Sequence, residues 1–207
     1  MKTKKTQYMA FMALFLAIQI LLVITPLGYL PLGPIDATTM HIPVIVAAIV
    51  FGRKAGAQLG FVFGITSVLN ATFRPNITSF VFSPFVTVAG ISGNWTSLLI
   101  AIVPRILLGY FSGVLFEVLK KHRVNEQLCI ITASLAGAIT NTVLVLGGIY
   151  FFFGEAYAKA VHVAYEVLSA VLLGVVTTNG IAEAVLGAIA CLLIVKALAP
   201  FMKKYQK

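Results

Sequence analysis

The sequence predicts an all-α membrane protein: one integral-membrane domain, residues 1–207, built as a bundle of six transmembrane helices with both termini in the cytoplasm. Of its 207 residues, 60% are hydrophobic and only 10% are charged, and the mean hydropathy is +1.02. An ordinary soluble domain has roughly 25% charged residues. Several apolar runs also reach the length of about 20 residues with which a helix crosses a hydrocarbon core of about 30 Å.

The basic residues indicate the orientation of the bundle. Most of the fifteen lie in four clusters, within residues 2–5, 53–54, 120–123 and 196–207. Six spans with a cytoplasmic N-terminus place all four clusters on the cytoplasmic side, as the positive-inside rule requires. The net charge of +9 therefore reflects membrane topology and gives no reason to expect a nucleic-acid partner.

The first span is expected at residues 6–24, and Pro26 ends it because proline cannot continue the hydrogen-bond ladder. No small-residue cleavage site follows this run, which favours a retained helix over a signal peptide. Ala13 and Ala17 lie one turn apart on one face, and small residues at this spacing let another helix approach closely. Two interpretations stay open: a packing contact inside the bundle, or a docking face for a separate membrane subunit.

The next part of the chain alternates between a polar loop and two short spans. Residues 26–38 contain three prolines and two glycines, which indicates a shaped outer loop that carries Tyr29 and Asp36 and is able to fold over a site as a lid. Spans are expected at residues 39–52 and 55–69, joined by a tight cytoplasmic turn at 53–54. The second has glycines at 56, 60 and 64, a spacing that permits close helix contact.

Residues 70–121 contain the strongest sign of a binding site. A polar break at 70–85 precedes a Gly/Ser turn and a fourth span at 95–120, which has Arg105 inside it. An arginine at membrane depth costs about 2.5–3.5 kcal/mol on insertion scales, so it normally faces a partner or a cavity. The pattern predicts a small-molecule site at the outer end of the bundle.

The last two spans are expected at residues 128–153 and 178–199, with an outer loop at 154–165 between them. The apolar region 167–198 would form a helix of roughly 48 Å, which exceeds the hydrocarbon core. Thr178 and its polar neighbours interrupt this region and offer an N-cap. The apolar piece before Thr178 then becomes part of the outer loop, or a half-helix over the site.

Polar residues of the last three spans form the candidate site. Asn179 and Glu183 share one helix face, Asn141 lies in the fifth span and Arg105 in the fourth. This set suits a compact hydrophilic ligand with an anionic end, because arginine binds carboxylates in a bidentate manner. An Arg105–Glu183 ion pair, or an interhelical hydrogen bond of Asn141, remains the structural alternative.

Other chemistries have weaker support. Gly90 to Gly93 match the G-x-S-G signature of intramembrane serine proteases, but such a serine needs a histidine base. The histidines downstream, His122 and His162, fall in loops on opposite sides of the membrane. No nucleotide loop or metal-binding spacing is present, so neither an enzyme nor a cofactor is expected. Cys129 and Cys191 are interpreted as packing residues.

Four stretches of the chain resemble one family. They are residues 38–52 (TTMHIPVIVAAIVFG), 75–85 (PNITSFVFSPF), 104–109 (PRILLG) and 179–184 (NGIAEA), and a glycine-rich third span accompanies them. Together they resemble the substrate-binding S components of energy-coupling-factor (ECF) vitamin transporters, and most of all the pantothenate-specific PanT group. The resemblance covers essentially the whole chain.

The resemblance implies a multi-pass subunit of the bacterial plasma membrane that binds its vitamin on the outer side. It would dock through Ala13 and Ala17 on the transmembrane coupling subunit EcfT, which carries two cytoplasmic ECF ATPases, and would deliver the vitamin by toppling in the lipid bilayer. Pantothenate would place its carboxylate on Arg105. The substrate-binding residues expected from the pattern and the resemblance together are Asn76, Ser79, Ser83, Arg105, Asn141, Asn179 and Glu183.

Two alternatives are kept. The first is an S component for another small vitamin or precursor, such as pyridoxine, hydroxymethylpyrimidine or riboflavin. The second is a stand-alone membrane transporter without ATPase partners, which copurification of those partners would exclude.

Overall fold

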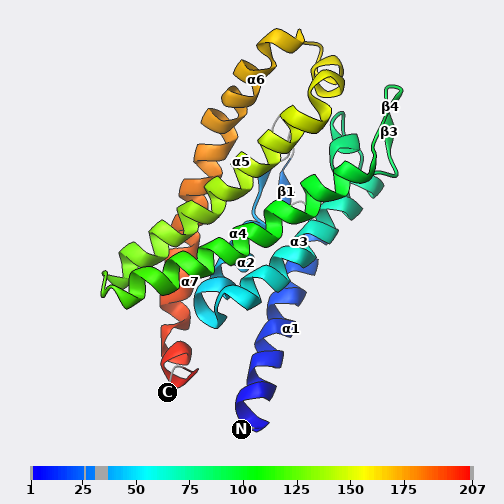
Figure 1. Ribbon diagram of the computed structural model, residues 1–207. Coiled ribbons are helices and arrows are strands. Elements are labelled where there is room, and N and C mark those ends of the chain that lie inside the picture. Colours follow the sequence, from blue (N-terminus) through cyan, green and yellow to red (C-terminus); the bar gives the residue numbers. More distant parts are fainter. Residues whose placement is uncertain (1, 26, 31–36, 206–207) are drawn as a thin grey trace.

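The protein is an elongated bundle of helices in the computed structural model, which describes residues 2–25, 27–30 and 37–205 (Figure 1). Two short antiparallel hairpins, β1–β2 and β3–β4, are its only sheets among these residues. In chain order the elements are α1 (Lys2–Ile24), β1 (Tyr29–Leu30), β2 (Ala37–Thr38), α2 (His41–Phe51), α3 (Arg53–Phe73), the 3-10 turn η1 (Ser79–Val81), β3 (Thr87–Val88), β4 (Ile91–Ser92), α4 (Trp95–Lys121), α5 (Glu126–Ala160), the 3-10 turn η2 (Tyr165–Val167), α6 (Leu168–Val175), the π-helical turn η3 (Val176–Gly180) and α7 (Ile181–Tyr205).

Within the described part of the chain, four helical segments are long and apolar enough to cross a membrane: α3, α4, α5 and the continuous stretch Tyr165–Pro200. Two shorter apolar helices, Tyr8–Ile24 and His41–Phe51, accompany them. The helices coincide with the six apolar runs of the sequence, although several bounds differ. The expectation of a helical membrane protein is therefore confirmed.

Helix α2 lies at the centre of the bundle. Eight of its eleven residues are buried, and it contacts α3, α4 and α7. An element surrounded by other helices needs apolar residues on every side, which explains why α2 lacks a polar face. The larger core cluster forms around α2, and a second cluster fills the end of the bundle where η1, α5 and α6 meet.

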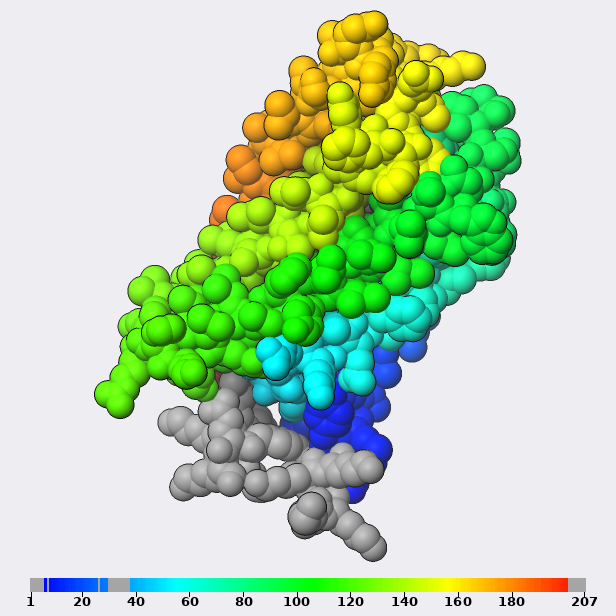
Figure 2. Space-filling model, viewed as in Figure 1, coloured from blue at the N-terminus to red at the C-terminus, as the bar shows by residue number. Residues whose placement is uncertain are grey.

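Glycines bring α3 and α4 into close contact, as their spacing in the sequence predicts. A Cβ on Gly56 would lie 2.5 Å from the carbonyl oxygen of Gly109, and one on Gly64 would lie 2.7 Å from the Cα of Ile102. Neither position has room for a side chain. Helix α4 also packs along α5, and the two form one continuous face of the molecule (Figure 2).

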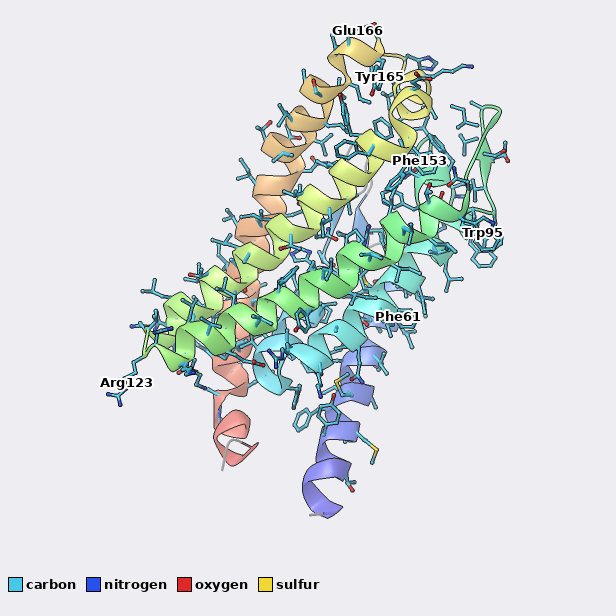
Figure 3. The ribbon with its side chains drawn as sticks, viewed as in Figure 1. Phe61, Trp95, Arg123, Phe153, Tyr165 and Glu166 are labelled. Carbon is cyan, nitrogen blue, oxygen red and sulfur yellow. The ribbon has the colours of Figure 1, made fainter. Side chains whose placement is uncertain are left out.

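The ends of the bundle differ in character. In Figure 1 the N- and C-termini lie at the same end as the α2–α3 and α4–α5 turns. Arg123 marks the α4–α5 turn in Figure 3, and Glu166 marks the opposite end, where α5 turns into α6. Both hairpins lie toward that second end, and so does η1, so the polar loops gather there.

Two helices extend beyond their expected ends. Helix α3 continues to Phe73, beyond the expected end at 69, and α5 continues to Ala160, so most of the expected outer loop 154–165 is helical. Tyr157, Ala158 and Ala160 of this extension are buried in the second core cluster, and this burial stabilises the extra turns.

The expected N-cap at Thr178 is also wrong. The chain stays helical from Leu168 to Tyr205, and Thr178 lies inside the π-helical turn η3. The hydroxyls of Thr177 and Thr178 both donate to the carbonyl oxygen of Gly174, at 2.9 Å each. Because these hydroxyls donate to a carbonyl of the preceding turn, Thr177 and Thr178 change the winding of the helix locally and do not end it.

Candidate functional site

A cavity of about 800 Å³, counting the space open to solvent, lies between the long helices and beside the β1–β2 hairpin. The lining is mixed, because amides, hydroxyls and two charged groups alternate with apolar side chains. The residues are Tyr29, Thr38, Ser67, Asn70, Ala71, Asn76, Ser79, Phe82, Arg105, Asn141, Thr142, Val145, Leu146, Val175, Asn179, Gly180 and Glu183.

Arg105 supplies the positive charge of the cavity. Its side chain is only 7% exposed, and its guanidinium carbon lies 5.5 Å from the ring centroid of Phe63 and 5.3 Å from that of Phe82. One terminal nitrogen, Nη1, donates to the carbonyl oxygen of Ile100 at 2.7 Å. The aromatic faces and the carbonyl hold the guanidinium in place, and its planar fork has further donors for a ligand.

Among the described residues, no carboxylate lies within ion-pair distance of the Arg105 guanidinium. The Nε atom of Arg105 is buried without a hydrogen-bond partner. Across residues 2–25, 27–30 and 37–205, the ion pair at 4.0 Å or less is Arg53–Glu117, at 3.9 Å and half-exposed at the opposite end of α4. An Arg105–Glu183 ion pair is therefore absent. A buried guanidinium that contacts no described carboxylate directly keeps donors available for an anionic ligand.

Glu183 of α7 forms a hydrogen bond with the β1–β2 hairpin. Its Oε1 atom accepts a hydrogen bond from the backbone nitrogen of Thr38 at 3.1 Å. On the other strand of the same hairpin, the hydroxyl of Tyr29 lies 3.2 Å from Thr66 Oγ1 and 3.3 Å from Ser67 Oγ. Tyr29 and Thr38 of this hairpin thus line the cavity, while Asp36 lies outside the described residues.

The segment after α3 is a compact polar turn. The side-chain oxygen of Asn76 accepts from the backbone nitrogen of Thr78 at 3.0 Å and from Ser79 Oγ at 3.0 Å. Ser79 Oγ accepts in turn from the backbone nitrogen of Asn76 at 2.8 Å. Such turns are typical of asparagine, whose side chain imitates a backbone carbonyl. The turn presents Asn76 and Ser79 to the cavity.

Ser83 lies elsewhere. Its buried hydroxyl is 2.7 Å from Thr72 Oγ1, and it accepts from the backbone nitrogen of Phe85 at 3.2 Å. The side chain does not belong to the lining of the cavity. In this structure it connects the polar turn to the end of α3.

The two remaining asparagines reach the cavity from α5 and from the π-helical turn. The side-chain oxygen of Asn141 is buried and has no hydrogen-bond partner. Asn179 lies in η3, where the wider winding of the chain interrupts the regular helix next to the lining. π-Helical turns of this kind are frequent at functional sites. The structure thus brings together six of the seven expected side chains, all except Ser83.

Six polar or aromatic lining residues were not expected from the sequence. Ser67 and Asn70 belong to α3, and with Ala71 they follow the i, i+3, i+4 spacing of one helix face, which was the available signal. Tyr29 and Thr38 lie in a loop whose path has no periodic signal. Phe82 and Thr142 resemble ordinary core and membrane residues in the sequence.

The expected docking residues lie far from the cavity on the first helix. Ala13 and Ala17 are both exposed on the surface of α1, so they do not form a packing contact inside the described bundle. Larger exposed side chains, Leu14 and Leu21, lie on the same helix. The face is apolar and accessible to another helix.

The matching family and the two similar proteins found by comparison with known proteins are all described as transport proteins. The profile of the family described as "ECF transporter, substrate-specific component" matches residues 7–195. The chain is 35% identical over 201 residues to the "Pantothenic acid transporter PanT" of Lactococcus lactis subsp. cremoris, and the match covers 96% of each chain. It is also similar to the "Pantothenate transporter PanT" of Leuconostoc mesenteroides subsp. mesenteroides, with 29% identity over 216 residues and coverage of 99% of this chain and 98% of the relative.

Proposed function

We propose that this chain, which belongs to the family of ECF transporter substrate-specific components, binds pantothenate in the cavity and carries it across the plasma membrane. The observation that carries the proposal is the buried guanidinium of Arg105, which faces a polar cavity and has no carboxylate of the described chain within ion-pair distance. Pantothenate offers one carboxylate, one amide and two hydroxyls, and the two named relatives support this choice over other vitamins.

The proposed contacts follow from the chemistry of each group. Arg105 binds the carboxylate, since a fork of donors between two aromatic rings suits a planar anion. The neutral groups of Asn76, Ser79, Asn141 and Asn179 exchange hydrogen bonds with the amide and hydroxyls, and Glu183 accepts from a hydroxyl. Ser83 acts indirectly, because it holds the polar turn through Thr72.

The proposed topology has six spans in one domain, residues 1–207, with both termini in the cytoplasm. The four basic clusters of the sequence lie at the termini and at the α2–α3 and α4–α5 turns, which share one end of the bundle in Figure 1. Positive residues collect on the cytoplasmic side. The opening of the cavity beside the β1–β2 hairpin then faces outward.

The energy for transport comes from partners in this proposal. Ala13 and Ala17 on α1 bind the coupling subunit EcfT, which carries two cytoplasmic ECF ATPases, and the small side chains permit a close helix–helix approach. The bound vitamin is then released inside as the subunit topples in the bilayer.

Calorimetric titration of the purified protein with a panel of water-soluble vitamins tests the proposal. Selective, saturable binding of pantothenate is the expected result, and selective binding of pyridoxine, hydroxymethylpyrimidine or riboflavin instead would replace the substrate. Trp95 is 77% exposed and lies at the outer corner of the molecule in Figure 3, so its fluorescence is a poor reporter. Copurification of EcfT and the ATPases separates this function from a stand-alone transporter.

A further inference from the structure

The cavity contains two opposite charges that do not neutralise each other by direct contact. Arg105 reaches it from α4 and Glu183 from α7. Arg105 bonds to a backbone carbonyl and Glu183 to a backbone N–H, so each has a neutral partner. Among the described lining residues, the formal charges of Arg105 and Glu183 therefore sum to zero before a ligand binds.

A monoanionic ligand changes this sum. Once pantothenate fills the cavity and displaces water, two carboxylates share one guanidinium in a membrane-embedded space of low dielectric. A second negative charge in such a site favours the neutral, protonated form of one carboxyl group. The ligand carboxylate binds Arg105 and stays ionised, so Glu183 is the group that gains the proton.

We propose that Glu183 takes up one proton from solvent when pantothenate binds, so that this substrate enters the membrane as an electrically neutral complex. The proposal rests on the assignment of pantothenate to this cavity. In the step, one O–H bond forms on Glu183 and the buffer acid loses the proton; no other bond changes. A protonated Glu183 also gains a donor for a ligand hydroxyl while its other oxygen still accepts from Thr38.

The other charged and titratable groups around Glu183 fit this assignment. Among the described residues, Arg105 faces it from α4 and Tyr29 from β1, and α3, α5 and η3 contribute neutral serine, threonine and asparagine side chains. From α2, His41 lies one turn further along α7, where its Nε2 atom is 2.3 Å from the position of a Cβ on Gly187. His41 is buried and its Nε2 atom is without a hydrogen-bond partner, so it is the competing proton site to be tested.

The experiment is calorimetric titration of the full-length protein with pantothenate near pH 8, in buffers with different ionisation enthalpies, such as HEPES, Tricine and Tris. The slope of the binding heat against the ionisation enthalpy gives the number of protons exchanged, and we expect about one proton taken up. Kd should increase about tenfold per pH unit while free Glu183 is ionised and bound Glu183 is protonated. Binding with the same heat in every buffer would overturn this inference alone, whereas no binding in any buffer would overturn the proposed function with it.

Three comparisons locate the proton. In Glu183→Gln, which keeps an acceptor for Thr38, binding should show no buffer dependence, and in His41→Gln the uptake should match that of the wild type. The reverse pattern would place the proton on His41 and overturn the assignment. Pantothenol, the alcohol analogue without a carboxylate, should bind to the wild-type protein without proton uptake, and uptake with this neutral ligand would also contradict the proposal.

Discussion

Gly60 of α3 packs directly against the backbone of Arg105 on α4. A Cβ added to Gly60 would lie 2.2 Å from the carbonyl oxygen of Arg105 and 2.8 Å from its carbonyl carbon. The contact is thus between two backbones, which cannot move aside as a flexible side chain can. The backbone of Arg105, the residue that supplies the positive charge of the cavity, is therefore positioned by its packing against Gly60.

The first prediction is that Gly60→Ala lowers both stability and affinity. Overpacking of this kind costs about 1–3 kcal/mol, and relief of the clash must displace the segment that carries Arg105. Thermal unfolding in detergent and calorimetric Kd values measure the two effects. Gly147→Ala is the matched control, because a Cβ there meets nothing within 4 Å; an equal loss in both variants would argue against the contact.

The second prediction concerns Arg105→Ala, which should strongly weaken the binding of pantothenate while the protein stays folded. Truncation of one partner of a buried charge pair costs about 2–5 kcal/mol, which corresponds to at least about a 30-fold increase in Kd. The fold is expected to survive because the substitution also removes the desolvation cost of a buried cation.

Arg105→Lys is the control that separates charge from geometry. Lysine keeps the positive charge but lacks the planar fork, so it should bind pantothenate more weakly than arginine and better than alanine. Unchanged affinity in Arg105→Ala would show that the arginine serves the structure only.

The third prediction separates docking from binding. Ala13→Trp or Ala17→Trp should leave the Kd of the purified subunit unchanged but stop vitamin uptake by cells, because a large side chain prevents close approach of a second helix. Uptake of labelled pantothenate and copurification of EcfT are the measurements. Val143→Trp, on a 62% exposed position of α5, controls for the effect of a bulky residue facing lipid.

The fourth prediction is that Asn141→Leu makes the empty protein more stable and weakens binding. The buried oxygen of Asn141 has no partner, and an unsatisfied buried polar group costs about 1–3 kcal/mol that an apolar side chain avoids. The unfolding temperature without ligand should rise while the stabilisation by pantothenate decreases. A lower unfolding temperature together with unchanged affinity would assign Asn141 to the structure.

The sequence predicted the helices better than their ends. Composition and apolar run length establish a membrane bundle, since only internal hydrogen bonding satisfies a backbone in lipid. The bounds depend on tertiary contacts that no local pattern contains. Burial of Tyr157 beside Leu168 extends α5 past its apolar run, and back-bonding of Thr177 and Thr178 replaces the expected N-cap.

The candidate site was predictable where polar residues interrupt apolar spans, because such residues need a reason to be there. Arg105, Asn141 and Glu183 stand out in this way, and the structure places all three on one cavity. Tyr29 and Thr38 do not stand out, because the sequence of a loop does not indicate which of its side chains face the cavity. Ser83 is the opposite case. It is a polar residue near the site, but its hydroxyl forms hydrogen bonds with Thr72 and Phe85 and does not line the cavity.

The π-helical turn at Val176–Gly180 also sets the rotational phase between α6 and α7. Each residue of an α-helix turns the chain by about 100°. If the same residues were wound as a plain α-helix, α6 would rotate by about that angle about its own axis. Leu168 and Leu172, the buried side chains of α6, would then leave the second core cluster and face lipid. The π-helical winding therefore allows α6 and α7, which form one long helix, to pack each against its own neighbours.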